Sequence, residues 1–175
     1  MNIKVKKVNA NAVIPTYATD GSAGFDLYAV EDVIIAPGET KKVPLGLSFE
    51  LPEGYCLLIL PRSGLSYKTK LRQPNSVGVI DADYRGEVCM MFDNIQHYRE
   101  EEEATTVDGE YIIYNVSDEY HYCSENFFDA GSYVINKGDR IAQGIIQEIP
   151  KVRFEEVESL SITSRGSGGF GSTGY

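Results

Sequence analysis

Tryptophan is absent from this 175-residue chain, and cysteine and histidine are scarce. The three cysteines, Cys56, Cys89 and Cys123, are an odd number without a CxxC pair, which favours reduced thiols in a cytoplasmic protein and argues against a zinc site. Two histidines, His97 and His121, are too few for a multi-histidine metal centre. No apolar run approaches the roughly 20 residues that cross a bilayer, and the basic start MNIKVKKVNA lacks the apolar stretch of a secretory signal.

Positive charge is also in deficit, because 16 Lys and Arg residues stand against 26 Asp and Glu residues, for a net charge of −10. Such a chain is a poor non-specific ligand for DNA or RNA, so a polyanionic ligand would need a local cluster of donors or a bound cation. The composition, 42% hydrophobic and 24% charged, is that of a folded globular protein, and the length is that of one domain.

Short apolar runs rich in β-branched and aromatic residues alternate with Gly, Pro, Asn and Asp, a pattern that predicts an all-β sandwich, jelly roll or barrel. The expected strands are 3–8, 24–29, 33–35, 42–44, 47–51, 55–60, 77–80, 86–92, 133–135 and 141–149. One short helix is expected near 63–71, where a serine could cap it.

Residues 95–128 differ in composition from the rest of the chain. They carry nine acids and one base, five of the twelve tyrosines and both histidines. Because most connections in compact domains are about 4–6 residues long, we interpret this stretch as an inserted subdomain or a large structured loop. Alternation in 110–116 predicts at least one strand there, and the alternative is a solvated acidic loop.

The tail, residues 161–175, is rich in glycine and contains Arg165 and Phe170. Such a tail is either a flexible end or an arm whose backbone N–H groups and hydroxyls clasp phosphate. It is not a Walker A loop, because the lysine of that motif is missing.

Three further clusters carry chemistry. Residues 61–64, PRSG, place an arginine and a hydroxyl at a strand end, which suits phosphate, although a polar turn explains them equally well. Residues 75–86 look like a buried strand that runs into Asp81 and Asp83, so Asp81 is a candidate general base, or both acids simply make the turn. Asp26 lies inside an apolar strand and needs a partner, either an arginine or a hydrated cation.

Taken in order, AGFDLYA (23–29), PRSGLS (61–66), NSVGVIDADYRGEV (75–88), GDRIAQGI (138–145) and RGSGGFGSTG (165–174) resemble the five motifs of the homotrimeric dUTPases. The resemblance covers essentially the whole chain except residues 95–128. It implies a jelly-roll β-barrel, a homotrimer whose active sites lie between subunits, and hydrolysis of dUTP to dUMP and pyrophosphate with Mg²⁺.

The resemblance also implies roles for single residues. Asp81 would activate the water that attacks the α-phosphorus, Tyr84 would pack under the deoxyribose, and Phe170 would stack on uracil. Asp26 would help to order the hydration shell of Mg²⁺, whose direct ligands would be the substrate phosphates. The residues implied in substrate binding are Arg62, Ser63, Gly64, Asn75, Gly78, Tyr84, Gln143, Arg165, Phe170, Gly171, Ser172 and Thr173.

Two departures from the family pattern stand out. Ser167 occupies a place where the family commonly has an acid. Residues 95–128 resemble the inserts of some bacteriophage-encoded dUTPases, which implies a regulatory protein partner and, for a phage protein, the cytoplasm of a bacterial host.

The predicted division is a jelly-roll core of residues 1–94 and 129–160, the insert 95–128 and a closing arm 161–175. A dCTP deaminase of the same superfamily and a non-enzymatic binding protein are the alternatives.

Overall fold

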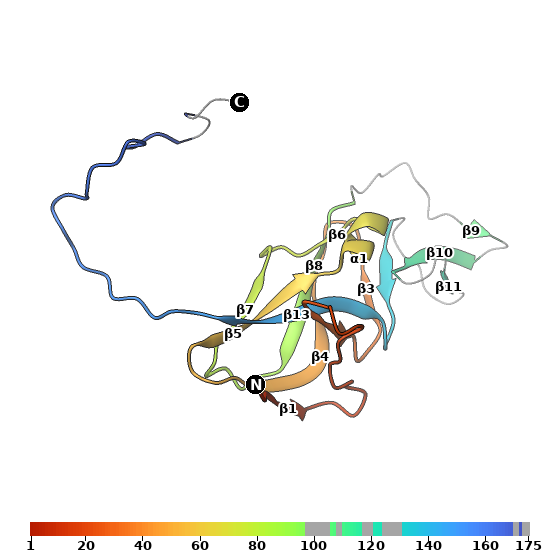
Figure 1. The fold of residues 1–175 in the computed structure, drawn as a ribbon. Helices are drawn as coiled ribbons and strands as arrows, with labels where there is room; N and C mark the ends of the chain where they lie inside the picture. The colour runs from red at the N-terminus through yellow and green to blue at the C-terminus, as the bar shows by residue number, and fades with distance from the viewer. Residues whose placement is uncertain (97–105, 108–109, 117–120, 124–130, 170–171, 173–175) are drawn as a thin grey trace.

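The computed structural model of the chain describes residues 1–96, 106–107, 110–116, 121–123, 131–169 and 172. Figure 1 shows a body of β-strands from which the C-terminal segment extends. The expectation of a jelly-roll-like, nearly all-β fold with one short helix is confirmed. That helix, α1 (Ser63–Lys68), has six residues, and no helix in the described ranges is long and apolar enough to cross a membrane.

Three sheets form the body. The first has the order β1 (Lys4–Lys7), β4 (Thr40–Glu50), β8 (Val88–Asn94), β6 (Leu71–Arg72). The second has the order β2 (Phe25–Tyr28), β13 (Arg140–Glu148), β5 (Tyr55–Pro61), β7 (Gly78–Ile80). The third has the order β11 (His121–Cys123), β10 (Glu110–Asn115), β12 (Tyr133–Ile135), β3 (Val33–Ile35), with β9 (Thr106–Val107) paired to β10.

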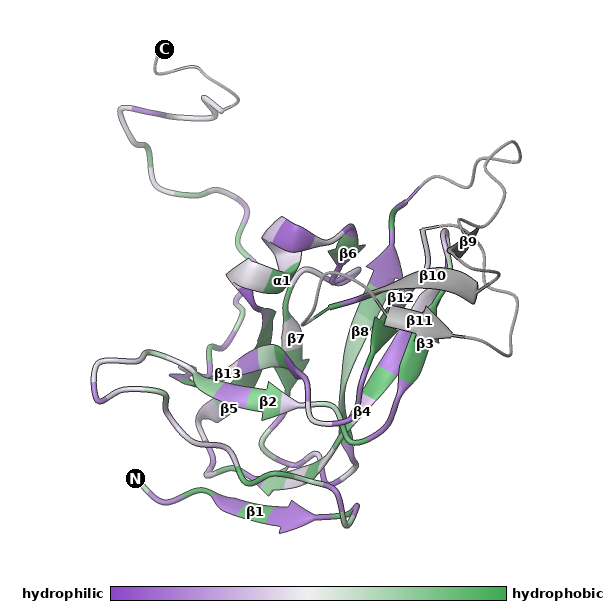
Figure 2. Cartoon of the chain, turned by 90° about the vertical axis from the view of Figure 1, so that its right-hand side faces the viewer, coloured by the Kyte–Doolittle hydropathy of each residue, from purple (hydrophilic) through white to green (hydrophobic). Residues whose placement is uncertain are grey.

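Alternation along the strands builds the core between the sheets. Every second residue of β8 is buried, from Val88 to Asn94, because successive side chains of a strand point to opposite faces. Figure 2 shows the same mixture of hydrophobic and hydrophilic positions along the strands of the body. The largest fully buried side chains come from several sheets and include Leu27, Ile35, Leu45, Leu57, Met90, Phe92 and Ile141.

Two expected strands, 42–44 and 47–51, are one strand in the structure. β4 runs unbroken from Thr40 to Glu50, and its register against β8 shifts between Pro44 and Leu47. Gly46 lies in the shift with φ +67°, and a Cβ there would meet Val30 and Ala12 at 2.7 and 2.8 Å. Glycine therefore allows a bulge where the sequence pattern predicts a break.

The serine cap expected for the helix is wrong. The N-cap residue is Arg62, with extended backbone dihedrals and no capping side-chain hydrogen bond. Ser63 is thus the first helical residue, so its hydroxyl is not used as a cap. The helix ends at Lys68, before the short strand β6, which the apolar pattern did not predict.

The third sheet confirms the strand expected in 110–116, because β10 covers Glu110–Asn115. Most other residues of the stretch 95–128 lie outside the described ranges. Its division from the core as a separate subdomain stays a prediction. Where it returns to the core, β10 pairs with β12, with Asn115 opposite Val134.

Candidate functional site

Asp26 forms the centre of a charged cluster at the ends of three strands. Its Oδ1 lies 3.3 Å from Nε of Arg62, and its Oδ2 lies 3.2 Å from Nη1 of Arg140. Arg62 Nη1 also donates to the carbonyl oxygen of Arg140 at 3.0 Å. Only 14% of the Asp26 side chain is exposed, so the expected arginine partner is confirmed, and there are two of them. The cluster forms because β13 lies between β2 and β5.

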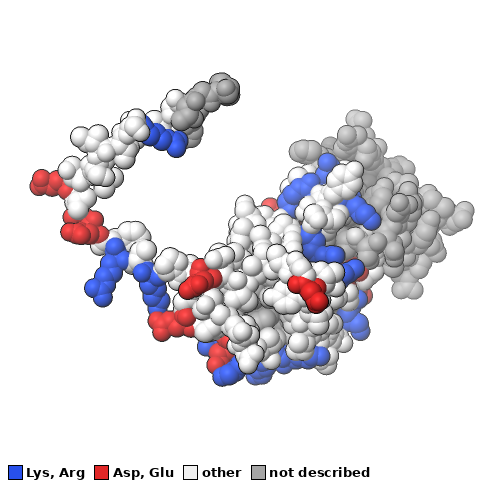
Figure 3. All heavy atoms as spheres, in the orientation of Figure 1, with Lys and Arg blue, Asp and Glu red and all other residues white. Residues whose placement is uncertain are grey.

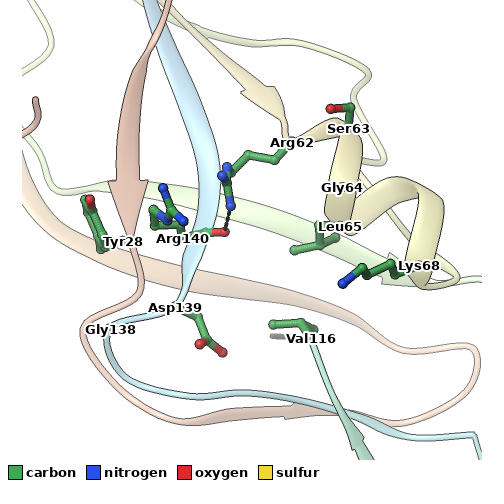
Figure 4. Close-up of a pocket in the computed structure, with 10 residues that line it drawn as sticks. All are labelled: Tyr28, Arg62, Ser63, Gly64, Leu65, Lys68, Val116, Gly138, Asp139 and Arg140. Atoms are coloured by element: carbon green, nitrogen blue, oxygen red, sulfur yellow. Dashed lines mark hydrogen bonds between the residues drawn. The ribbon is translucent and has the colours of Figure 1, made fainter. Parts of the chain in front are cut away.

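A cavity of about 490 Å³ opens beside this cluster, between α1 and the turn that enters β13. In Figure 4, Arg62 and Arg140 face each other across its edge, while Lys68 reaches toward its centre from the end of α1. Its lining consists of Tyr28, Arg62, Ser63, Gly64, Leu65, Lys68, Val116, Gly138, Asp139 and Arg140. We call it the basic pocket.

Three of the residues implied in substrate binding thus share one cavity: Arg62, Ser63 and Gly64. Gln143 does not line it. Its register partners are Asp26 on β2 and Leu60 on β5, and its Nε2 donates to the carbonyl oxygen of Pro61 at 3.1 Å. In this chain Gln143 therefore holds the strand end that carries Arg62.

A second cavity, of about 300 Å³, contains the other group of predicted site residues. We call it the hairpin pocket, because the turn after β7 forms one of its walls. Asn75, Gly78, Asp81 and Tyr84 all line it. The remaining lining residues are Lys42, Ile59, Gln73, Val79, Ile80, Glu87, Val88, Cys89 and Met91.

The turn itself is closed by one backbone hydrogen bond and by one hydrogen bond from the Tyr84 side chain. The Tyr84 N–H donates to the carbonyl oxygen of Asp81 at 3.2 Å, and the Tyr84 hydroxyl donates to the carbonyl oxygen of Glu87 at 3.0 Å. A Cβ at Gly86 would lie 2.5 Å from Cζ of Tyr84, so only glycine leaves room for this ring position. The arrangement holds the ring and the exposed Asp81 on one turn.

The strand predicted before Asp81 is present as β7, but the prediction that it is buried is wrong for the single chain. Among the described residues, β7 is the edge of its sheet and pairs with β5 alone, and 57% of Val79 is exposed. An edge strand leaves backbone N–H and C=O groups unpaired on one side, and here the Val79 side chain is exposed as well, so both are available to another chain.

The two described site residues of the C-terminal arm, Arg165 and Ser172, line neither pocket. Arg165 Nε donates to the carbonyl oxygen of Gly168 at 2.9 Å, and the Ser172 N–H donates to the carbonyl oxygen of Gly169 at 3.1 Å, so both contacts are local. Figure 1 shows this segment extended from the body. Phe170, Gly171 and Thr173 lie outside the described residues.

The cysteines next to the hairpin pocket are poor nucleophiles. Burial, and after it the charge of Asp81, raises the pKa of the Cys56 thiol. Burial, with Glu87 as the second cause, raises the pKa of the Cys89 thiol. Because the thiolate is the reactive form, both groups stay in their inert protonated form at neutral pH.

Several residues of the two pockets escaped the sequence reasoning. The motifs AGFDLYA and GDRIAQGI contain Tyr28, Asp139 and Arg140 without indicating a role for them, and Lys68 lies outside the five motifs. Gln73 donates through Nε2 to the carbonyl oxygen of Ile59 at 3.2 Å, a bond that no motif indicates. The glycine–aspartate turn before Arg140 was the one available signal, because it starts the strand that pairs with Asp26.

Comparison with known proteins gives a consistent result. A family model described as dUTPase matches residues 10–99 and 128–174. The deoxyuridine 5′-triphosphate nucleotidohydrolase of Nautilia profundicola is 41% identical over 174 residues, with 99% of each chain covered.

Two solved structures are also similar. The dUTPase of Staphylococcus bacteriophage 80alpha with dUpNHpp has a TM-score of 0.88 and 32% identity, with 99% of each chain covered. A mutant dUTPase of phage phi11 of S. aureus has a TM-score of 0.80 and 27% identity, covers 91% of this chain and 98% of its own, and is described as revealing the coordination of a structural Mg(II) ion.

Proposed function

Since this chain belongs to the dUTPase family and hydrolyses dUTP to dUMP and pyrophosphate, we propose that Asp81 is the base of the reaction. Its carboxylate takes a proton from a water that attacks the α-phosphorus in line. The bond between that phosphorus and the bridging oxygen breaks, and pyrophosphate leaves. The hairpin pocket supports this role most directly, because it brings Asp81 and Tyr84 together on one turn.

The same pocket supports a division of recognition between base and sugar. Asn75 and the backbone near Gly78 read the uracil edge, and the Tyr84 ring packs under the deoxyribose. The hydroxyl of Tyr84 is tied to Glu87, so the ring cannot easily move away from an added 2′-hydroxyl. Discrimination against UTP is then steric.

The basic pocket and the arm together bind the phosphates of the substrate. Arg62, Ser63 and Gly64 line the basic pocket, and Gln143 holds the strand end beside it. Arg165, Phe170, Gly171, Ser172 and Thr173 complete the site when the arm closes over bound nucleotide. Closure of a glycine-rich arm excludes water and commits the substrate.

Members of the dUTPase family are generally Mg²⁺-dependent, and the phage phi11 relative has a structural Mg(II) ion. The described residues include no group of three or more His, Cys, Asp or Glu side chains that could hold a metal. The Asp26 carboxylate already contacts two guanidinium groups. We propose that an ion would arrive on the substrate phosphates, with Asp26 helping to order its hydration shell. Such an ion neutralises phosphate charge.

We further propose that three copies assemble, with each site built from different subunits, as the resemblance to the homotrimeric dUTPases implies. The two pockets of one chain have no lining residue in common. The segment that follows β13 carries Val152, Phe154, Leu160 and Ile162, each at least 63% exposed, which is unfavourable unless another surface covers them. β7 is the edge of its sheet, so its unpaired backbone groups are available to a second subunit.

The test is a panel of nucleotides: dUTP, dTTP, dCTP and UTP, with pyrophosphate and ammonia measured separately. We expect pyrophosphate from dUTP alone, because the pocket excludes a 5-methyl group and a 2′-hydroxyl. Tyr84→Ala should raise turnover of UTP relative to dUTP, whereas Tyr84→Phe, which keeps the ring, should not. Ammonia release from dCTP would favour the deaminase alternative, and equal turnover of UTP by the unchanged chain would contradict the role of Tyr84.

A second role, binding of a regulatory protein through residues 95–128, has one observation in its favour. Val116, at the end of the β10 segment, is buried and lines the basic pocket, so this stretch touches the candidate site. Structures of the phage 80alpha dUTPase are described in the context of phage dUTPases that control the transfer of virulence genes. A variant without residues 95–128 should lose cross-links to host proteins; unchanged cross-links would remove this role.

A further inference from the structure

Lys68 is a third cation of the basic pocket. It occupies the last turn of α1, five residues after Ser63, and its side chain extends toward the space in front of Arg140 and Val116 (Figure 4). Figure 3 shows that Lys and Arg side chains gather around α1 on this face, although the chain as a whole carries a charge of −10.

The three cations differ in how much of their charge is already balanced. Arg62 and Arg140 both contact the Asp26 carboxylate, at 3.3 and 3.2 Å. Lys68 forms no ion pair within the part of the chain that the structure describes. Its ammonium group is therefore the cation of this pocket with the most charge left for an incoming anion.

Resting on the proposed function, we propose that Lys68 binds the β- and γ-phosphates of dUTP, the part of the substrate that leaves as pyrophosphate. The cavity, about 490 Å³, is large enough for this group. Lysine suits the task, because its ammonium is a compact charge with three donors on a flexible stem that can follow the oxygens of a terminal phosphate. Arg62 and Arg140, which already contact Asp26, add positive charge to the same pocket from more fixed positions.

The experiment compares Lys68→Met with Lys70→Met in the full-length chain. Lys70 has the same charge two residues away, and it does not line the pocket. We expect Lys68→Met to raise KM for dUTP roughly tenfold or more, the effect of losing one hydrogen bond to a charged group. Turnover at saturation should stay within about threefold, because the reacting water and Asp81 are unaffected. Lys70→Met should behave like the unchanged chain.

Inhibition by the two products separates phosphate binding from a structural role. The inhibition constant for pyrophosphate should rise with KM in Lys68→Met, while that for dUMP stays constant, because dUMP lacks the two outer phosphates. Lys68→Arg should recover most of the affinity. An unchanged KM, an equal rise in Lys70→Met, or an equal loss of dUMP affinity would each overturn the proposal. Since the unchanged chain is assayed in parallel, absence of dUTP turnover there would instead count against the proposed function.

Discussion

Replacing Asp81 with asparagine is expected to lower kcat for dUTP roughly a thousandfold, because the amide has the shape of the carboxylate but cannot accept a proton from water. The fold should survive, since the turn is held by the Asp81 carbonyl oxygen and not by its side chain. Pyrophosphate release under saturating dUTP measures the loss.

Asp83→Asn is the matched control for this change. It removes the same charge from the same exposed turn, but Asp83 does not line the hairpin pocket. We expect its turnover to remain near that of the unchanged chain. If Asp81→Asn retained a tenth of the activity, or if Asp83→Asn lost as much, the carboxylate at position 81 would not be the base.

Ending the chain at Ser164 is expected to lower kcat/KM about a hundredfold, which is the usual scale when substrate is bound but imperfectly enclosed. The truncation removes the whole motif RGSGGFGSTG. The hydrogen bonds that Arg165 and Ser172 form with described residues stay within the arm, so the body should keep its stability. A chain that lacks only Tyr175 is the control, because it keeps the motif intact.

The same truncated chain tests whether each site is shared between subunits. When it is refolded together with full-length Asp81→Asn, mixed trimers contain sites with an intact Asp81 from one chain and an intact arm from another. Random assembly would restore about a quarter of the full activity. If every site used Asp81 and the arm of one and the same chain, the mixture would stay inactive. Sedimentation of the truncated chain shows whether it still assembles.

The prediction of the fold was accurate where a local pattern was sufficient. Short apolar runs rich in β-branched and aromatic residues located strands such as β3 and β12 at their observed bounds, because such residues between turn residues favour a strand locally. The pattern was wrong at Gly46, where a bulge continues β4, and at Ser63, where the preceding residue is the cap. Both errors concern single backbone dihedral angles, on which hydrophobicity has no bearing.

The candidate site shows the same division between what a local sequence pattern predicts and what it does not. Five motifs in order led to the family and to Asp81, Tyr84 and Arg62, and a lone acid in an apolar strand required a cation for Asp26. By itself, the sequence thus determined the chemistry that is present. Only the tertiary structure decided that Arg62 and Arg140, 78 residues apart, share this carboxylate, that Lys68 joins them without a described partner, and that β7 is an edge. Backbone ladders pair strands through groups that every residue shares, so which distant strands become neighbours depends on the packing of the whole chain.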